Sequence, residues 1–279
     1  MAHASSRLSV LSAEQVEAFR TYGHVRVKEA MPPRLALRMQ DEIWAELARE
    51  HDILRTQPDT WVQPRTMPAG AKRSPLNREL IGPRFRGVID DLLGPGRWRE
   101  PGTWGGFVLK FPAPPDVTWT VPDDSWHWDG GPGPGLLIFS FFSRVAPGGG
   151  GTCLLSGSPR LIAEFYQSLS PAERALRHKV HRKKFLSSDP WLAALSGRVP
   201  MPAADRIDAF MARPTEVRGV ACQVVELTGE PGDVVFCSPM MLHALAPNCS
   251  PVPRFLRVKF FYPATPPPDG QRSSDQRPR

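Results

Sequence analysis

Hydrophobic and polar positions follow two different patterns along the chain, and the change comes near residue 104. Before it, apolar residues recur at helical spacing, whereas after it short runs of β-branched and aromatic residues alternate with Gly and Pro turns. Many short strands between such turns are typical of a β-sandwich or a jelly-roll barrel. The pattern therefore predicts a mainly β protein with flanking helices, in which N-terminal helices lead into a jelly-roll core.

The first half of the chain carries explicit helix signals. Ser12 and Gln15 have the spacing of a capping box, so a helix should begin there and run to about Tyr22, where Gly23 stops it. Residues 24–30 then alternate like a strand. Apolar spacing predicts two further helices, over about 32–50 and about 77–93.

The second half is expected to hold short strands and one helical interruption. The strands are expected at 104–111, 125–129, 135–143, 151–157, 222–229, 233–239 and 254–262. Helical patterns replace them at about 159–218, which predicts a helical insertion or lid, because strands resume at Val220. We expect a single domain over residues 1–262 and a disordered, proline-rich tail over 263–279.

Composition narrows the class of protein. Hydrophobic residues at 41% and charged residues at 23% are ordinary for a globular protein. The four cysteines lack C-x-x-C spacing, which argues against a zinc ribbon or a disulfide framework. The longest apolar run, over 135–142, is far shorter than a membrane span, and the N-terminus lacks a signal pattern. We therefore expect a cytoplasmic protein.

The formal net charge of +7 has one concentrated source, the segment RALRHKVHRKK at 174–184. Two interpretations stay open: a solvated helix face, or a surface that recognises an anionic substrate or partner. Aromatic residues do not interleave the basic ones, which disfavours nucleic-acid binding.

Candidate metal ligands lie in the segment SWHWD. In an extended chain His127 and Asp129 point to the same face, so the two side chains converge. Alone, such a pair is a weak signal. His243 supplies a second imidazole downstream, and two histidines with one carboxylate form the facial triad of non-haem Fe(II). Arg254 follows eleven positions later, and its planar fork can grip the distal carboxylate of a dicarboxylate.

With these residues the sequence resembles the phytanoyl-CoA dioxygenase-like family of Fe(II)/2-oxoglutarate oxygenases. The resemblance covers about residues 11–262 and thins over 50–90 and 165–215. It rests on the motifs LSAEQVEAFRTYGHVRV, LLGPG, FVLKFPAPP, WHWDGG, GGGGTCLLSGSP, GDVVFCSPMMLHALAPNCS and PRFLRVKFFY. It implies a double-stranded β-helix, that is, a cupin-like jelly roll.

The resemblance also assigns roles by position. It makes His127, Asp129 and His243 the iron ligands and Arg254 the residue that binds the C5 carboxylate of 2-oxoglutarate. Three further positions match residues of the cosubstrate cavity, with ordinary structural roles as the alternative in each case: Phe139 (strand packing), Lys110 (a solvent-facing lysine) and Thr152 (a turn hydroxyl). The carboxylate ligand is retained, which points away from halogenation, whereas Leu256 departs from the Arg-x-Ser pairing of some relatives.

The implied activity uses Fe(II), 2-oxoglutarate and O2 to hydroxylate a C–H bond of a small molecule, with release of succinate and CO2. Desaturation, epoxidation or cyclisation at the same iron ligands stay open, as does a protein of another class, a non-catalytic jelly-roll binding module. Four tryptophans are expected near the metal and suggest an apolar or planar substrate: Trp126, Trp128, Trp104 and Trp119. The basic segment 174–184 adds the alternative of an anionic one.

Overall fold

The computed structural model describes residues 9–64 and 69–262. The tail predicted to be disordered, residues 263–279, lies outside them. Two antiparallel sheets form the core, a 5-stranded sheet in the order β1-β7-β3-β9-β2 and a 4-stranded sheet in the order β5-β6-β4-β8. The strands are β1 (His24–Val27), β2 (Gly106–Lys110), β3 (Leu136–Phe141), β4 (Thr152–Ser156), β5 (Thr215–Val217), β6 (Val220–Glu226), β7 (Val234–Cys237), β8 (His243–Leu245) and β9 (Arg254–Phe261).

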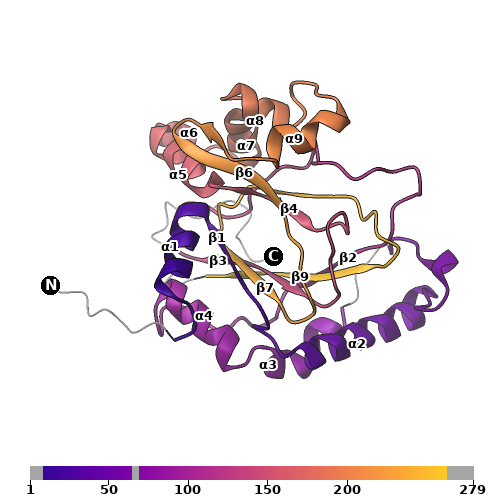
Figure 1. Cartoon of the computed structure of the whole chain (residues 1–279). Coiled ribbons are helices and arrows are strands. Elements are labelled where there is room, and N and C mark those ends of the chain that lie inside the picture. The colour runs from indigo at the N-terminus through magenta and orange to yellow at the C-terminus, as the bar shows by residue number, and fades with distance from the viewer. Residues whose placement is uncertain (1–8, 65–68, 263–279) are drawn as a thin grey trace.

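Helices cover both sides of this core. They are α1 (Ala13–Tyr22), α2 (Pro33–His51), α3 (Leu76–Leu80), α4 (Pro83–Leu93), α5 (Ser158–Ser168), α6 (Pro171–Arg174), α7 (His178–Leu186), α8 (Pro190–Leu195) and α9 (Arg206–Phe210), with 3-10 turns at η1 (Pro58–Thr60), η2 (Ala71–Arg73) and η3 (Ala203–Asp205). In Figure 1, α2, α3 and α4 run below the five-stranded sheet, and α5 to α9 gather at the opposite side. The prediction of a jelly roll with flanking helices is confirmed.

The N-terminal helix signals are confirmed in detail. The Ser12 side chain accepts from the Gln15 amide, and the Gln15 side chain accepts from the Ser12 amide. Gly23 ends α1 in the left-handed region, at φ +82°, where a Cβ would be strained.

The helix predicted over 77–93 is in fact two helices. α3 ends at Leu80 and α4 begins at Pro83, with the extended Gly82 between them. Proline lacks the amide proton that would continue the helix, and its ring would clash with the preceding turn, so it suits the first position of a new helix. The apolar periodicity runs through this break, which is why the spacing alone missed it.

Strand β9 divides the molecule into two layers. On the outer face of β9, Phe255 and Phe261 belong to the core beneath the N-terminal helices. On its inner face, Leu256, Val258 and Phe260 belong to the apolar interior between the sheets. The two-residue period of a strand therefore places alternate β9 side chains in different environments. The candidate metal centre lies on the side of the inner face.

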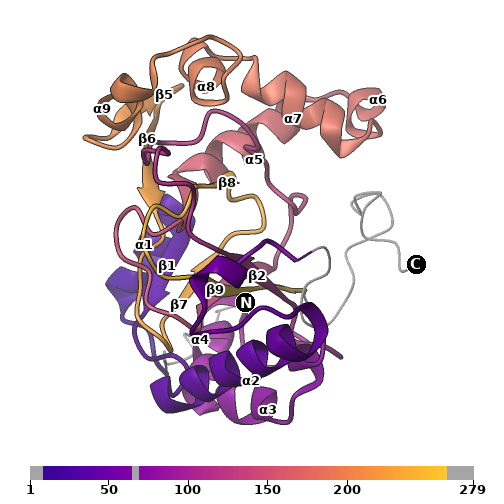
Figure 2. The same cartoon turned by 90° about the vertical axis from the view of Figure 1, so that its right-hand side faces the viewer.

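The helical insertion connects β4 to β5, which lie on either side of β6 in the four-stranded sheet. It leaves β4 at α5 and returns after α9, and β4 and β6 pair directly, with Cys153 opposite Glu226. The turned view shows it as a separate layer at the far side of the four-stranded sheet (Figure 2). The insertion was predicted to be helical over 159–218. The end of this range is wrong, because β5 pairs with β6 before residue 218.

Within residues 9–64 and 69–262, no helix is both long and apolar enough to cross a membrane.

Candidate metal centre

His127, Asp129 and His243 come together at one end of the barrel interior. One ligand atom from each lies within 4.8 Å of those of the other two. The Asp129 carboxylate lies between the imidazoles, with Oδ2 at 3.4 Å from His243 Nε2 and Oδ1 at 3.7 Å from His127 Nε2. These separations suit three ligands that face a common ion.

The segment SWHWD does not form the strand predicted for it. Its only ladder contact among the described residues is a single antiparallel bridge between His127 and His243, in which His127 N donates to His243 O (2.9 Å) and His243 N donates to His127 O (2.8 Å). This bridge is enough to bring the two histidines face to face, with ring centroids 4.2 Å apart. The convergence was predicted correctly, although the strand was not.

Both imidazoles are held in the orientation that a metal ligand needs. His127 Nδ1 lies 2.6 Å from Ser125 O, and His243 Nδ1 lies 2.9 Å from Met241 O. A backbone carbonyl accepts a proton from Nδ1, so Nε2 keeps its lone pair for a metal. In each case the carbonyl belongs to the residue two positions earlier, so a tight local turn fixes the ligand.

Two backbone features permit these turns. Ser125 lies in the left-handed region at φ +60°, which is uncommon for a residue with a side chain and is found where function requires it. Gly130, directly after Asp129, packs so closely on the β7–β8 loop that a Cβ would lie 2.2 Å from Pro239 Cβ. Gly130 N also donates to Pro239 O at 3.0 Å. The glycine thus holds the Asp129 segment against the loop that leads to His243.

The electrostatics favour a carboxylate beside neutral imidazoles. Burial works to raise the pKa of Asp129, but its contacts with His243, His127 and Arg182 hold that pKa below its ordinary value. Burial and the neighbouring His243 lower the pKa of His127 below 6.5. Near neutral pH this set offers one anionic oxygen ligand and a neutral imidazole nitrogen, as metal binding requires.

Arg182 of the insertion helix α7 reaches this centre. Its Nε and Nη2 both donate to Trp128 O, at 3.1 and 2.7 Å, and Nη2 lies 3.5 Å from Asp129 Oδ1. The basic segment is therefore more than a solvated face, since Arg182 is half-buried and His178 and His181 are buried. Sequence reasoning missed this contact, because nothing local links positions 54 residues apart.

Arg254 is the second notable feature of the interior. Its side chain is 1% exposed, and Nη1 donates to Gly150 O. Nε and Nη2 are buried without a hydrogen-bond partner. Burial lowers its pKa to about 10, still well above neutral, and Glu226 acts to raise it. A buried cation with two free donors, on a barrel that also holds the triad, could hold an anion through two hydrogen bonds.

The other predicted cosubstrate residues face the same interior. Lys110 pairs directly with Arg254 across the β2–β9 ladder, so both side chains are on one face. Phe139 contacts His243 edge to face, with ring centroids 5.8 Å apart. Thr152 is buried two residues before Leu154, which pairs with His243. The three residues are thus in place, and their contact with a cosubstrate stays a prediction.

The tryptophans predicted to wall the site face away from it. Trp128 is fully buried among insertion residues such as Tyr166 and Phe185, and Trp126 packs in the same cluster. Trp104 contacts Phe85 and Phe261 in the core beneath the N-terminal helices. The alternation that points His127 and Asp129 inward necessarily points Trp126 and Trp128 outward. Trp119 is only partly buried and also packs against the insertion cluster.

Comparisons with known proteins agree on the fold. No protein-family model and no curated protein matches the chain. Among solved structures, SnoK, a non-heme alpha ketoglutarate dependent carbocyclase from nogalamycin biosynthesis, is similar with a TM-score of 0.53 and 17% identity over 90% of this chain and 83% of that chain. SnoN, a non-heme alpha ketoglutarate dependent epimerase from the same biosynthesis, gives 0.51 and 17% over 90% and 83%.

AviO1 from Streptomyces viridochromogenes Tue57 gives a TM-score of 0.54 and 17% identity over 94% of this chain and 99% of that chain. At such identities the likeness concerns the fold, and this chain has the fold of these proteins along nearly its whole described length. Membership of the phytanoyl-CoA dioxygenase-like family stays a prediction from its motifs.

Proposed function

We propose that this chain is a non-haem Fe(II)- and 2-oxoglutarate-dependent oxygenase that acts on a small molecule. One observation carries the proposal: a buried arginine with two unpaired donors shares the barrel interior with a His-Asp-His cluster of metal-binding geometry. A metal site alone fits many classes of protein, and a buried arginine alone fits an ordinary core. Together they fit a metal that needs a dicarboxylate cosubstrate.

The donor set suits Fe(II). Two imidazoles and one carboxylate on one side of an ion leave its other positions open, as in non-haem iron oxygenases. His127, Asp129 and His243 would hold the metal, and the carbonyls of Ser125 and Met241 would keep the imidazoles oriented. SnoK and SnoN, which share the fold, are themselves alpha ketoglutarate dependent, which supports the class by analogy of fold.

The unpaired donors of Arg254 suit 2-oxoglutarate. Nε and Nη2 lie side by side on the guanidinium edge, which is the geometry that grips a carboxylate through two hydrogen bonds. Lys110 adds a second positive charge at the directly opposed position of β2. The metal would take the other end of the cosubstrate, so Arg254 would set its direction in the barrel.

When bound, the iron and 2-oxoglutarate would supply the activation of O2 and the oxidation of a C–H bond, with succinate and CO2 as coproducts. The chain's own share is binding, orientation and exclusion of water. Phe139 and the apolar inner face of β9 would keep the space beside His243 dry. We propose hydroxylation as the outcome, and product analysis would distinguish it from desaturation, epoxidation or cyclisation.

Anaerobic titration tests the proposal. Fe(II) is added to the protein and then 2-oxoglutarate, and the visible charge-transfer band of the iron–cosubstrate complex is followed. The native protein should give the band, His127→Ala should lose it, and His24→Ala, a histidine outside the cluster, should keep it. Absence of the band in the native protein, or an equal band in His127→Ala, would refute the metal assignment.

Succinate formation separates an enzyme from a binding module of the same fold. A protein that gives the band but no succinate above the metal-free background in air, with or without candidate substrates, would be the binding module. Succinate that rises with a substrate and disappears in His127→Ala supports turnover at this centre.

A further inference from the structure

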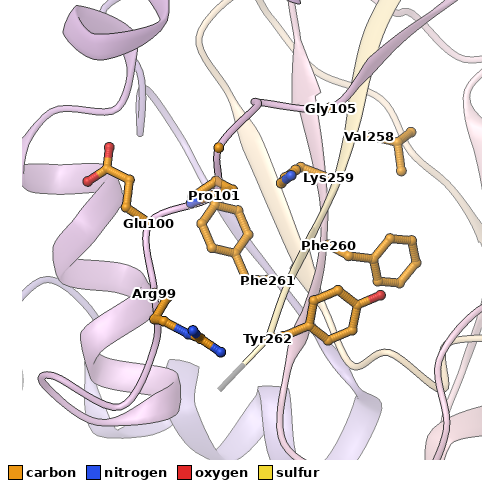
Figure 3. Close-up of a pocket in the computed structure, with 10 residues that line it drawn as sticks. Arg99, Glu100, Pro101, Gly105, Val258, Lys259, Phe260, Phe261 and Tyr262 are labelled. Atoms are coloured by element: carbon orange, nitrogen blue, oxygen red, sulfur yellow. The ribbon is translucent and has the colours of Figure 1, made fainter. Parts of the chain in front are cut away.

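The end of strand β9 borders a pocket that the proposed metal chemistry does not use. Its volume is about 470 Å³, and it is lined by the loop before β2 and by the last residues of β9 (Figure 3). The pocket exists because β2 stops pairing with β9 at Gly106, opposite Val258, so no strand in the described part of the chain pairs with residues 259–262 on that edge. A volume of this size suits a small molecule.

The pocket lies at the opposite end of β9 from Arg254. Phe139, which contacts His243, pairs with Val258 of β9. Arg254 comes four residues before Val258, and Tyr262 comes four residues after it, each about 14 Å along an extended strand. All three positions share the parity of the inner face, so Arg254, the position paired with Phe139 and the pocket follow one another along β9.

A second observation connects the pocket end to the metal ligands. Burial, with the negative charge of Asp129 as the next cause, raises the pKa of Tyr262 above its ordinary value. Phe260 packs against the same interior cluster as Phe139. Phe260, on the inner side of the pocket, therefore lies in the same interior as Phe139, which contacts His243.

Two stacked rings form one side of the pocket. The Phe260 and Tyr262 rings are nearly parallel, at 16° with centroids 6.1 Å apart, and lie next to each other in Figure 3. Phe260 is partly buried, while 46% of Tyr262 is exposed. Such faces favour a flat, conjugated ligand over a saturated one of equal size.

The charged side chains that line the pocket leave it with a net positive charge. Arg99 and Lys259 form no ion pair among residues 9–64 and 69–262, whereas Glu100 is neutralised by Arg86, whose Nη1 and Nη2 donate to its two oxygens at 2.6 and 2.8 Å. Two cations without a carboxylate partner favour an anionic ligand.

We propose that this pocket holds the organic substrate of the oxygenase, and that the substrate is a planar small molecule with an anionic group. Its ring system lies along Phe260 and Tyr262 on the inner face of β9, and its anion is held at the unpaired edge of the strand, where Lys259 and Arg99 also line the pocket. The assignment of this ligand as a substrate rests on the proposed function. The pocket and its ligand preference can be tested without metal.

The first test uses metal-free protein and three probes of similar size: 2-naphthoate, which is planar and anionic, 2-naphthamide, which is planar and neutral, and decalin-2-carboxylate, which is anionic and saturated. Binding is measured by saturation-transfer NMR and calorimetry. Naphthoate should bind tightest. Tyr262→Leu should weaken it about two- to tenfold through loss of ring contact, and Lys259→Met should abolish the preference for naphthoate over naphthamide.

Matched controls exist elsewhere on the surface. Tyr22, on α1, is exposed to the same 46% as Tyr262, so Tyr22→Leu should leave naphthoate binding unchanged. Lys28→Met serves as the control for Lys259→Met. If decalin-2-carboxylate binds as tightly as naphthoate, or if Tyr262→Leu behaves like Tyr22→Leu, the proposed pocket and ligand class are wrong.

The second test asks whether the probe sits beside the metal. Mn²⁺ is loaded with saturating 2-oxoglutarate, and the paramagnetic relaxation of the naphthoate protons is measured. The native protein should show strong enhancement, and Tyr262→Leu should weaken it with the affinity. Naphthoate that binds the native protein without enhancement, while Mn²⁺ is bound, overturns the substrate assignment. Failure of Mn²⁺ itself to bind, with naphthoate binding intact, overturns the proposed function and leaves the pocket established as a binding site.

Discussion

Two buried arginines lie three residues apart on β9 and face opposite layers of the molecule. Arg257 points outward beneath the N-terminal helices and uses its donors there: Nη1 donates to Asn77 Oδ1 at 2.5 Å and Nη2 to Met31 Sδ at 3.7 Å. Its guanidinium also lies 5.0 Å from the Phe142 ring centroid. Arg254 points inward, and two of its nitrogens have no partner.

The difference indicates what each face of the strand is for. A buried donor left without a partner costs about 1–3 kcal/mol, so two such donors on one buried guanidinium point to a ligand that completes them. Arg206 behaves like Arg257, because it donates to the carbonyls of Val121 and Pro122 and, within the insertion, to those of Ala194 and Leu195. Arg257 and Arg206 therefore hold the fold together, whereas the free donors of Arg254 fit the anion that we propose for it.

The comparison predicts its largest effect for Arg254→Met. This change should weaken 2-oxoglutarate by about 2–5 kcal/mol, since a buried charge pair loses one partner. Fe(II) affinity should not change, and the free energy of unfolding of the ligand-free protein should stay equal or rise, because an unpaired buried charge is removed. Calorimetry and denaturant unfolding measure the two quantities.

Arg254→Lys is the matched control, because it keeps the charge and loses the two-pronged geometry, so its 2-oxoglutarate affinity should fall between those of native and Met proteins. If Arg254→Met destabilised the free protein by several kcal/mol and left 2-oxoglutarate affinity intact, the inner arginine would be structural like the outer one.

Arg257→Met should do the reverse. Asn77 Oδ1 would lose its donor in a buried place, at a cost of about 1–3 kcal/mol in unfolding free energy. The amide cannot simply flip, because Asn77 Nδ2 donates to the carbonyls of Ala71, Lys72 and Ser74. Equilibrium unfolding should show this loss, while 2-oxoglutarate affinity stays native. A loss of cosubstrate affinity without a loss of stability would remove the distinction between the faces.

Much of this contrast was predictable from the sequence. Apolar runs and turn residues predicted most of the strands, although not β5 or β8, and the order of His127, Asp129, His243 and Arg254 predicted the candidate site. The sequence could not show that SWHWD would be held by a single bridge, because strand pairing is a long-range property. The outward direction of Trp128 could have been predicted, since alternation turns it away from the face that His127 and Asp129 share.

Arg182→Lys and Arg182→Met test a third arginine. Arg182 shares features with both Arg257 and Arg254, because it binds the backbone and this backbone lies beside a metal ligand. Its donors hold Trp128 O, and loss of such a support for a ligand typically costs about tenfold or more in metal affinity. The removed positive charge acts in the opposite direction, by reducing repulsion of the metal.

Arg182→Lys keeps that repulsion and loses the fork, so it should bind Ni²⁺ more weakly than Arg182→Met does. Lys183→Met, an exposed change on the same helix, should bind Ni²⁺ like the native protein. If Arg182→Lys binds Ni²⁺ with native affinity, Arg182 influences the centre by charge alone and does not position Asp129.

The smallest expected effect concerns Lys110, which shares the inner face with Arg254. Burial, and then the charge of Arg254, lower its pKa below 10.5. The protonated amine attracts 2-oxoglutarate, so affinity should be highest at low pH and should fall as pH rises through this lowered pKa. The change should be about threefold, since a half-exposed charge pair contributes at most about 1 kcal/mol.

The measurement is calorimetry of 2-oxoglutarate from pH 7 to 9.5, with protein loaded with Ni²⁺ and freed from excess metal. Lys110→Met should show no such fall. In Arg254→Met the fall should move to higher pH, because the neighbouring positive charge that lowers the Lys110 pKa is gone. An unchanged pH profile in Lys110→Met would assign the titration to another group, and Lys110 would then join the solvent-facing lysines and not the anion site on the inner face.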